Sequence, residues 1–165
     1  MITITGFILK FLSFFGLTQK IDRQETRHQQ IIEFLERLKV SKDIPILDVG
    51  CGNGNLLISL RNAGYTNLSG CDIDADKVYS DEFKYFKIDL NDKDLKFNKK
   101  YKLVLCSQVI EHLFNVKNAL EVIYQLVDKK GYALISYPNC ESIFMRASFL
   151  FGGKLPRYNP KSGGK

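Results

Sequence analysis

The spacing of hydrophobic positions changes along the chain. Residues 22–39 carry apolar side chains at intervals of three and four, which is typical of one face of an α-helix. From Ile46 onward, short apolar runs alternate with stretches of helical spacing. The runs predict strands over residues 46–49, 67–72, 85–90, 101–107 and 132–137. The helical spacing predicts helices over residues 55–63, 74–80, 116–127 and 142–151.

This alternation of strands and helices predicts an α/β fold. Helical crossovers join parallel strands, so we expect a Rossmann-like parallel sheet of about five strands flanked by helices. A turn over residues 129–131 should precede the fifth strand. The helix of residues 116–127 should turn one apolar stripe inward, formed by Val116, Ala119, Leu120, Ile123 and Leu126. Ligands of such sheets bind beyond the carboxyl ends of the strands, where we therefore look for chemistry.

The two ends of the chain differ from its middle. Residues 6–17 are rich in Phe and have one apolar helical face, which either covers the chain's own domain or lies in a membrane interface. No apolar stretch reaches the length of a membrane span, and a cleaved signal peptide fits poorly because Lys10 interrupts the run. Residues 152–165 are typical of coil. We expect an apolar helix over 1–20, a domain over 21–151 and a basic tail over 152–165.

Composition narrows the class of protein. The 165 residues suit one globular domain, and four Cys are too few for a disulfide scaffold. The cysteine spacing does not indicate a zinc site, so free thiols in a reducing cytoplasm are expected. The net charge is +6, and no acidic residue follows Glu141. A basic tail suits anionic partners, but an ordinary solvated surface of a Lys-rich protein is the interpretation we favour.

Three glycines follow the first predicted strand. Residues 48–55 read Asp-Val-Gly-Cys-Gly-Asn-Gly-Asn, with Gly50, Gly52 and Gly54 opening into a helix. Such a loop lets the backbone approach a ligand closely. The dinucleotide fingerprint needs its third glycine one residue later, where Asn55 stands. The spacing therefore argues against a nicotinamide-dependent oxidoreductase.

Acidic residues follow the next two strands. Asp72 ends the second strand, where a carboxylate can accept hydrogen bonds from a ribose diol; the alternative is a cap on the following short helix. Asp89 ends the third, where it can accept from an exocyclic amine such as that of adenine. Its alternative role is that of a turn residue, because Asn91 and Asp92 follow.

Five segments, in order, resemble class I S-adenosylmethionine-dependent methyltransferases. Residues 46–54 look like the family's glycine-rich motif, Gly70-Cys-Asp72 like its ribose-binding motif, and Asp89 like its adenine-contacting acid. Residues 104–113 and 131–139 are similar to segments of the family's small-molecule branch. The resemblance covers about residues 24–150.

The resemblance implies S-adenosylmethionine as cofactor and S-adenosylhomocysteine as product. The resemblance implies that Asp48 and the backbone of residues 50–52 hold the methionyl end. It also implies that Ser107 and Gln108, after the fourth strand, close over that end. Gln108 could equally start the next turn. Two acids suit a cationic sulfonium and would repel a dinucleotide's phosphates. The residues assigned to the cofactor by resemblance are Asp48, Gly50, Cys51, Gly52, Gly54, Asp72, Ile73, Asp89, Leu90, Ser107 and Gln108.

The implied reaction is an in-line methyl displacement onto an O, N or C atom of a small molecule. The Phe-rich segment favours an aromatic or lipid-like acceptor. His112 is the candidate general base, with a positioning role as its alternative, and Tyr137 is a weaker second candidate. A nucleic-acid acceptor is disfavoured, because Ser107 and Gln108 stand where amino-methylating DNA enzymes carry their Pro-rich run. Cys106 likewise lacks the preceding proline of cytosine-methylating enzymes.

The chain is short for this family, whose members close the sheet with a further helix and an antiparallel pair of strands. These elements need about 30 residues, and 26 follow Asn139. We therefore expect the closing hairpin to be lacking and the fifth strand to be an open edge. The N-terminal helix, a second copy of the chain in a homodimer, or residues lost by truncation would cover it. A cofactor-binding module without catalysis, or one that depends on a partner, is the alternative function.

Overall fold

The computed structural model describes residues 23–74, 83–92, 95, 99–137, 146 and 150. The chain divides into two units, Met1–Thr26 with Pro138–Lys165, and Arg27–Tyr137. The second unit holds every strand that the structure describes. The elements are α2 (Arg23–Arg37), β1 (Ile46–Val49), α3 (Asn55–Asn62), β2 (Leu68–Asp72), β3 (Lys84–Lys87), β4 (Tyr101–Ser107), the 3₁₀ helix η2 (Ile110–His112), α4 (Val116–Leu126) and β5 (Val127–Ser136).

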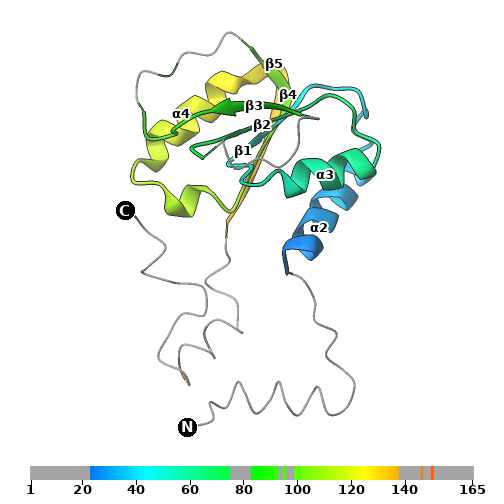
Figure 1. Cartoon of the computed structure of the whole chain (residues 1–165), viewed down its shortest axis with the longest axis horizontal. Coiled ribbons are helices and arrows are strands. Elements are labelled where there is room, and N and C mark those ends of the chain that lie inside the picture. Colours follow the sequence, from blue (N-terminus) through cyan, green and yellow to red (C-terminus); the bar gives the residue numbers. More distant parts are fainter. Residues whose placement is uncertain are drawn as a thin grey trace. The chain divides into compact units, whose positions relative to one another are not determined.

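The strands form one parallel sheet in the order β3-β2-β1-β4-β5 (Figure 1). This confirms the predicted Rossmann-like sheet. Val49, the last residue of β1, lies beside Cys71 of β2 and Cys106 of β4. Gly50, Asp72 and Ser107 therefore leave the sheet along the same edge.

Alternating side chains of β1 and β4 build a core on each face of the sheet. Ile46 and Leu103 pack toward α2 and α3, whose buried residues include Leu35 and Leu57. The residues next to them in β1 and β4 point to the opposite face of the sheet. There they pack with α4, through Ala119, Val122, Ile123 and Leu126. Because successive side chains of a strand point to opposite faces, two apolar layers follow directly from uninterrupted apolar strands.

The third and fifth strands differ most from their predicted bounds, whereas the other predicted elements that the structure describes agree within two residues at each end. β5 begins at Val127, directly after α4, where a turn was expected over residues 129–131. The irregularity lies inside the strand: Tyr101 pairs with Val127, but Leu103 pairs with Tyr132. A side chain on Gly131 would stand 2.8 Å from the carbonyl oxygen of Tyr101, so glycine permits this close approach. β3 ends at Lys87 rather than at residue 90, because the chain then turns.

The apolar stripe predicted for α4 was partly wrong. Ala119, Ile123 and Leu126 are buried, as expected, whereas Val116 and Leu120 are about two-fifths exposed. Val122 completes the buried face instead. The helix meets the sheet on a face rotated from the predicted one, and this leaves apolar side chains on its outer side.

Some predictions fall where the structure gives no description. These are the helices over residues 6–17, 74–80 and 142–151, of which only residues 74, 146 and 150 are described, and the tail over 152–165. The three predicted domain boundaries therefore remain predictions. Among the residues that are described, no helix has the length and apolarity required to span a bilayer.

Candidate functional site

The glycine loop after β1 is built on left-handed backbone. Gly50, Gly52 and Gly54 have φ angles of 72°, 51° and 82°, which residues with a side chain rarely adopt. The amides of Gly50 and Cys51 both donate to the carbonyl oxygen of Cys71, at 2.8 and 3.1 Å. The loop is therefore anchored to the end of β2.

The three glycines are needed for different reasons. A Cβ on Gly50 would stand 2.3 Å from a methyl carbon of Val109, and one on Gly54 would stand 2.6 Å from the hydroxyl oxygen of Tyr85. A Cβ on Gly52 would meet nothing within 4 Å. Gly50 is thus required by packing against a stiff β-branched side chain, whereas a Cβ on Gly54 would meet only the tip of the Tyr85 side chain. Gly52 borders open space that a ligand can enter.

Asp72 joins the loop to the end of β2. Its Oδ2 accepts a hydrogen bond from the Gly52 amide at 2.8 Å, and its Oδ1 accepts from the Asp74 amide at 3.0 Å. An ionised carboxylate has about four acceptor positions, so two remain for hydroxyl donors. Ile73 beside it is half exposed and offers an apolar surface. The bond to Asp74 also fits the alternative role of Asp72 as a local cap.

Asp89 lies at the exit of β3, next to that of β2. The Ile88 amide donates to the Asp72 carbonyl oxygen at 3.0 Å, which holds the two exits together. Asp89 Oδ1 accepts from both the backbone amide and the side-chain amide of Asn91, at 2.9 and 3.0 Å. The Leu90 side chain is buried in the core on the α4 side, so only its backbone is available to a ligand.

The chain leaves β4 through a strained residue. Gln108 has a φ of +59°, and its amide donates to the Ser136 carbonyl oxygen at 2.9 Å. This conformation costs a residue with a side chain roughly 1–2 kcal/mol. The hydroxyls of Ser107 and Ser136 are 2.9 Å apart. The turn places Val109 against Gly50. Gln108 therefore starts a turn and also lies at the exit of β4.

His112 ends η2 and is exposed in the loop between β4 and α4. Its backbone amide donates to the Val109 carbonyl oxygen at 2.9 Å, which fixes the start of the loop. Phe114, two residues on, is 97% exposed. Tyr137 follows β5 and is also exposed.

Burial sets the charge state of the groups beneath the loop. Asp48 is 3% exposed, and its desolvation, together with the nearby Asp72 charge, raises its pKa to about 8. Burial likewise raises the thiol pKa of Cys51 and of Cys106 to about 12 and that of Cys71 further. The three thiols are free and protonated at neutral pH, which makes them poor nucleophiles.

The site offers hydrogen-bonding groups that a polar ligand without phosphate can satisfy. Two carboxylates lie at neighbouring exits, and the backbone at Gly52 faces open space. The Tyr85 hydroxyl, beside Gly54, is buried with no hydrogen-bond partner among the described residues. Buried polar groups normally have partners, so this hydroxyl is a candidate for contact with a bound molecule or water. These features fit the adenosine and sulfonium of the expected cofactor.

Sequence reasoning missed the residues that hold this edge together. Val109, Tyr85, Asn91 and Asn118 each contact a predicted site residue or the backbone next to one. Asn91 was considered only as part of a turn. An Asp side chain in a turn typically accepts from the backbone amide two residues on, as Asp89 does from Asn91, and this was the one signal available.

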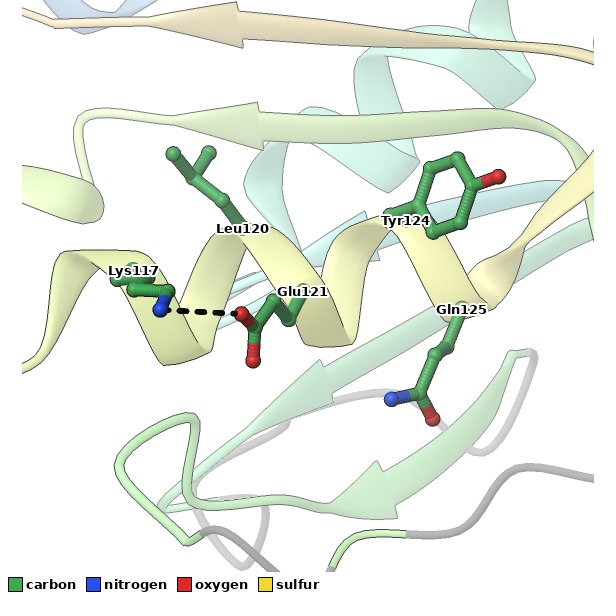
Figure 2. A pocket seen from close by; sticks show the side chains of 5 residues that line it. All are labelled: Lys117, Leu120, Glu121, Tyr124 and Gln125. Atoms are coloured by element: carbon green, nitrogen blue, oxygen red, sulfur yellow. Dashed lines mark ion pairs between the residues drawn. The ribbon is translucent and has the colours of Figure 1, made fainter.

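A surface depression on α4 is separate from this edge. The residues that line it all belong to one helix: Lys117, Leu120, Glu121, Tyr124 and Gln125 (Figure 2). Lys117 and Glu121 form an ion pair across one turn, 3.9 Å apart. None of the strand-end residues lines this depression, so it is not the expected cofactor site.

Comparison with known proteins gives one family match. A family model described as a methyltransferase domain matches residues 23–159. The ubiquinone biosynthesis O-methyltransferase of Rickettsia typhi is 29% identical over 156 residues, which are 87% of this chain and 59% of that protein. The protein of the same name from Rickettsia bellii is 32% identical over 135 residues, 76% of this chain and 54% of its own. The chain thus spans less than two thirds of these relatives.

Two solved structures show that other proteins share this fold. Magnesium protoporphyrin IX methyltransferase from Synechocystis, with bound S-adenosylhomocysteine, has a TM-score of 0.62 at 20% identity, covering 94% of this chain and 77% of its own. Coclaurine N-methyltransferase has a TM-score of 0.55 at 16% identity, covering 73% of this chain and 38% of its own.

The contact between Gly50 and Val109 leads to a stability prediction. Gly50→Ala combines a left-handed φ with a clash against a β-branched side chain, and we expect a loss of about 2–4 kcal/mol. Gly64→Ala is the matched control, because Gly64 has a φ of 92° and open space around its Cβ position. It should lose only about 1 kcal/mol. Urea unfolding measures both, and equal losses would contradict the packing argument.

The raised pKa of Asp48 leads to a pH prediction. The folded protein holds the Asp48 proton up to about pH 8, whereas an unfolded Asp releases it near pH 4. The folded state binds more protons between these values, so this contribution to stability falls as the pH rises from 4 to 8. Asp48→Asn cannot ionise. The difference in free energy of unfolding between Asp48→Asn and wild type should therefore shift in favour of the variant as the pH rises from 4 to 8, and stay constant above pH 9. Urea unfolding at fixed pH values measures this difference.

Proposed function

The chain belongs to the methyltransferase-domain family, and from this we propose that it binds S-adenosylmethionine and transfers its methyl group to a small-molecule acceptor. The family match over residues 23–159 supports the class of reaction. The single observation that carries the site is the hydrogen bond from the Gly52 amide to Asp72 Oδ2. It joins the loop expected to hold the methionyl end to the acid expected to hold the ribose.

We assign the adenosine end to the exits of β2 and β3. Asp72 accepts from the ribose hydroxyls with its remaining lone pairs, and Ile73 lies along the base. Asp89 accepts from the exocyclic amine of adenine. Both acids disfavour a phosphorylated cofactor, because carboxylates at neighbouring exits would repel phosphate.

We assign the methionyl end to the loop after β1. The backbone of Gly50, Cys51 and Gly52 surrounds it from one side, and Ser107 with Gln108 closes it from the other. Gly54 starts α3 and keeps the loop tight. Asp48 lies beneath, and a bound ammonium group would favour its ionised form over the protonated one.

The chain's own residues then have to orient the acceptor and exclude water. Bound S-adenosylmethionine supplies a methyl group that its sulfonium already activates for displacement. Holding the two reacting atoms in line provides most of the acceleration, and a base is needed only where the acceptor carries a proton. His112 is our candidate for that base, since it is exposed in the loop after β4, close in sequence to Ser107 and Gln108.

We propose a hydroxylated, aromatic and lipid-like acceptor. The relatives named ubiquinone biosynthesis O-methyltransferase support an O-methyl product. The almost fully exposed Phe114 ring, two residues from His112, offers an apolar surface for such a molecule. Cytoplasmic location with peripheral membrane contact through residues 6–17 belongs to this proposal, because a lipid-like acceptor partitions into membranes.

A second copy of the chain is our proposal for covering β5. This strand is the last of the described sheet, and Tyr132 on it is 77% exposed. Open strand edges are usually covered, so a homodimer through this edge would stabilise the sheet.

Removal of the Asp72 carboxylate tests the cofactor site. Asp72→Ala should weaken binding of S-adenosylhomocysteine by about 1–3 kcal/mol, because the ribose hydroxyls lose a charged acceptor. Asp128→Ala is the control: it removes an acid that pairs with Lys102 at 3.0 Å, near the starts of β4 and β5. Isothermal titration measures both. An unchanged affinity in Asp72→Ala would refute the ribose assignment.

Methyl transfer itself is tested with a catechol that bears a short isoprenoid tail and with S-adenosylmethionine labelled in its methyl group. Wild type should form the labelled ether. His112→Asn should lower kcat by ~10²–10⁴-fold, the usual contribution of a general base, and leave the dissociation constant of S-adenosylhomocysteine unchanged. His28→Asn, at the chain's other histidine, should keep wild-type kcat.

The same assay separates the alternatives. Tight binding of S-adenosylhomocysteine without any transfer would favour a module that lacks catalysis or needs a partner. Absence of binding would refute the proposal as a whole. Equal activity of His112→Asn and wild type would limit His112 to a positioning role.

A further inference from the structure

The Asn91 side chain bridges two segments of the candidate site. Its Nδ2 donates to Asp89 Oδ1 at 3.0 Å, and its Oδ1 accepts from the Phe114 backbone amide at 3.2 Å. The amide group can satisfy these contacts in only one orientation. If it were flipped, its oxygen would face the carboxylate and its NH₂ would face another N–H. Asn91 is therefore held by the loop that follows η2.

This bridge restricts the Asp89 carboxylate. Oδ1 accepts from both the backbone and the side-chain amide of Asn91, at 2.9 and 3.0 Å. Two donors on one oxygen oppose rotation of the carboxylate about its last bond. The second oxygen, Oδ2, is then the acceptor that remains for a ligand.

A second asparagine holds the backbone on both sides of Asn91. The Nδ2 of Asn118 donates to the carbonyl oxygens of Leu90 and Asp92, at 2.8 and 2.9 Å. The backbone amide of Asn118 in turn donates to Asn115 Oδ1 at 3.0 Å, which caps α4. The turn that carries Asp89 is thus fastened to the first turn of a helix.

We propose that Asn91 is a positioning residue that orients Asp89 and so determines selectivity for adenine over hypoxanthine. The inference rests on the proposed function, in which Asp89 reads the exocyclic amine. An oriented carboxylate oxygen accepts a hydrogen bond from the amine of adenine. The carbonyl oxygen of hypoxanthine at the same position has no proton to donate and is repelled.

The experiment compares S-adenosylhomocysteine with S-inosylhomocysteine by titration against the full chain. In the second ligand a carbonyl oxygen replaces the exocyclic amine, and the adjacent N1 carries a proton. Wild type should prefer the adenine ligand by at least ~10-fold, the value of one hydrogen bond to a charged group. Asn91→Ala removes the side-chain donor and keeps only the backbone amide on Asp89 Oδ1, so the carboxylate rotates more easily. The preference should therefore fall toward unity, mainly through weaker binding of the adenine ligand. Asn91→Asp should do the same, because it places a second carboxylate against Asp89.

Asn62→Asp, at the exposed end of α3, is the matched control and should keep the wild-type preference. Circular dichroism and urea unfolding check that each variant folds, and the two Asn91 variants provide independent tests. The ratio of the two dissociation constants is decisive, because a merely structural role would weaken both ligands equally and leave the ratio intact.

The outcomes distinguish this inference from the proposed function. If wild type binds neither ligand, the proposed function itself fails. If wild type binds both equally, or if the Asn91 variants keep the wild-type ratio, Asn91 does not determine selectivity, although the proposed function stands. A fall of the ratio confined to the Asn91 variants supports the inference.

Discussion

One hydrogen bond holds the candidate site together, that from the Gly52 amide to Asp72 Oδ2 at 2.8 Å. The two residues lie at the ends of different strands, and the bond brings the glycine loop onto the exit of β2. It forms because Gly52 has a left-handed backbone that turns its amide toward the carboxylate. Anchoring of Gly50 and Cys51 to the Cys71 carbonyl oxygen supplies the rest of the constraint. Loop and acid then present one surface to a ligand.

The same arrangement has a cost in stability. Asp48 is buried beneath the loop near the charge of Asp72, and it lowers that cost by holding its proton up to about pH 8. Gln108 adds backbone strain at the exit of β4. Strain and buried ionisable groups persist where the surrounding structure determines them and tend to cluster at functional sites. Both features lie within the same strand-end region, as a ligand-binding edge requires.

The sequence was sufficient for features that depend on local pattern. The apolar strands predicted a parallel sheet with two packed faces, and the glycine spacing predicted the loop after β1. Features that depend on contacts between distant residues were out of reach. The outward side of Leu120 follows from how α4 meets the sheet, and the early start of β5 follows from the approach of Gly131 to Tyr101. No periodicity encodes the bond between Asn91 and Phe114, whose residues are far apart in sequence.

The proposed cofactor site and the proposed acceptor site rely on different kinds of contact, hydrogen bonds in the first and apolar surface in the second. Groups assigned to the cofactor are held by hydrogen bonds between strand exits, from Gly50 to Gln108, within the unit Arg27–Tyr137. The proposed acceptor side offers instead an exposed ring at Phe114, whose burial would contribute about 1.5–3 kcal/mol. Directional bonds select one cofactor, whereas apolar contact tolerates many shapes. Among the described residues, the Asn91 side chain alone hydrogen-bonds both the Asp89 carboxylate and the backbone of Phe114. Because this connection passes through a single side-chain amide, a change at Asp89, the acid proposed to read the base, has a short physical route to the proposed acceptor side.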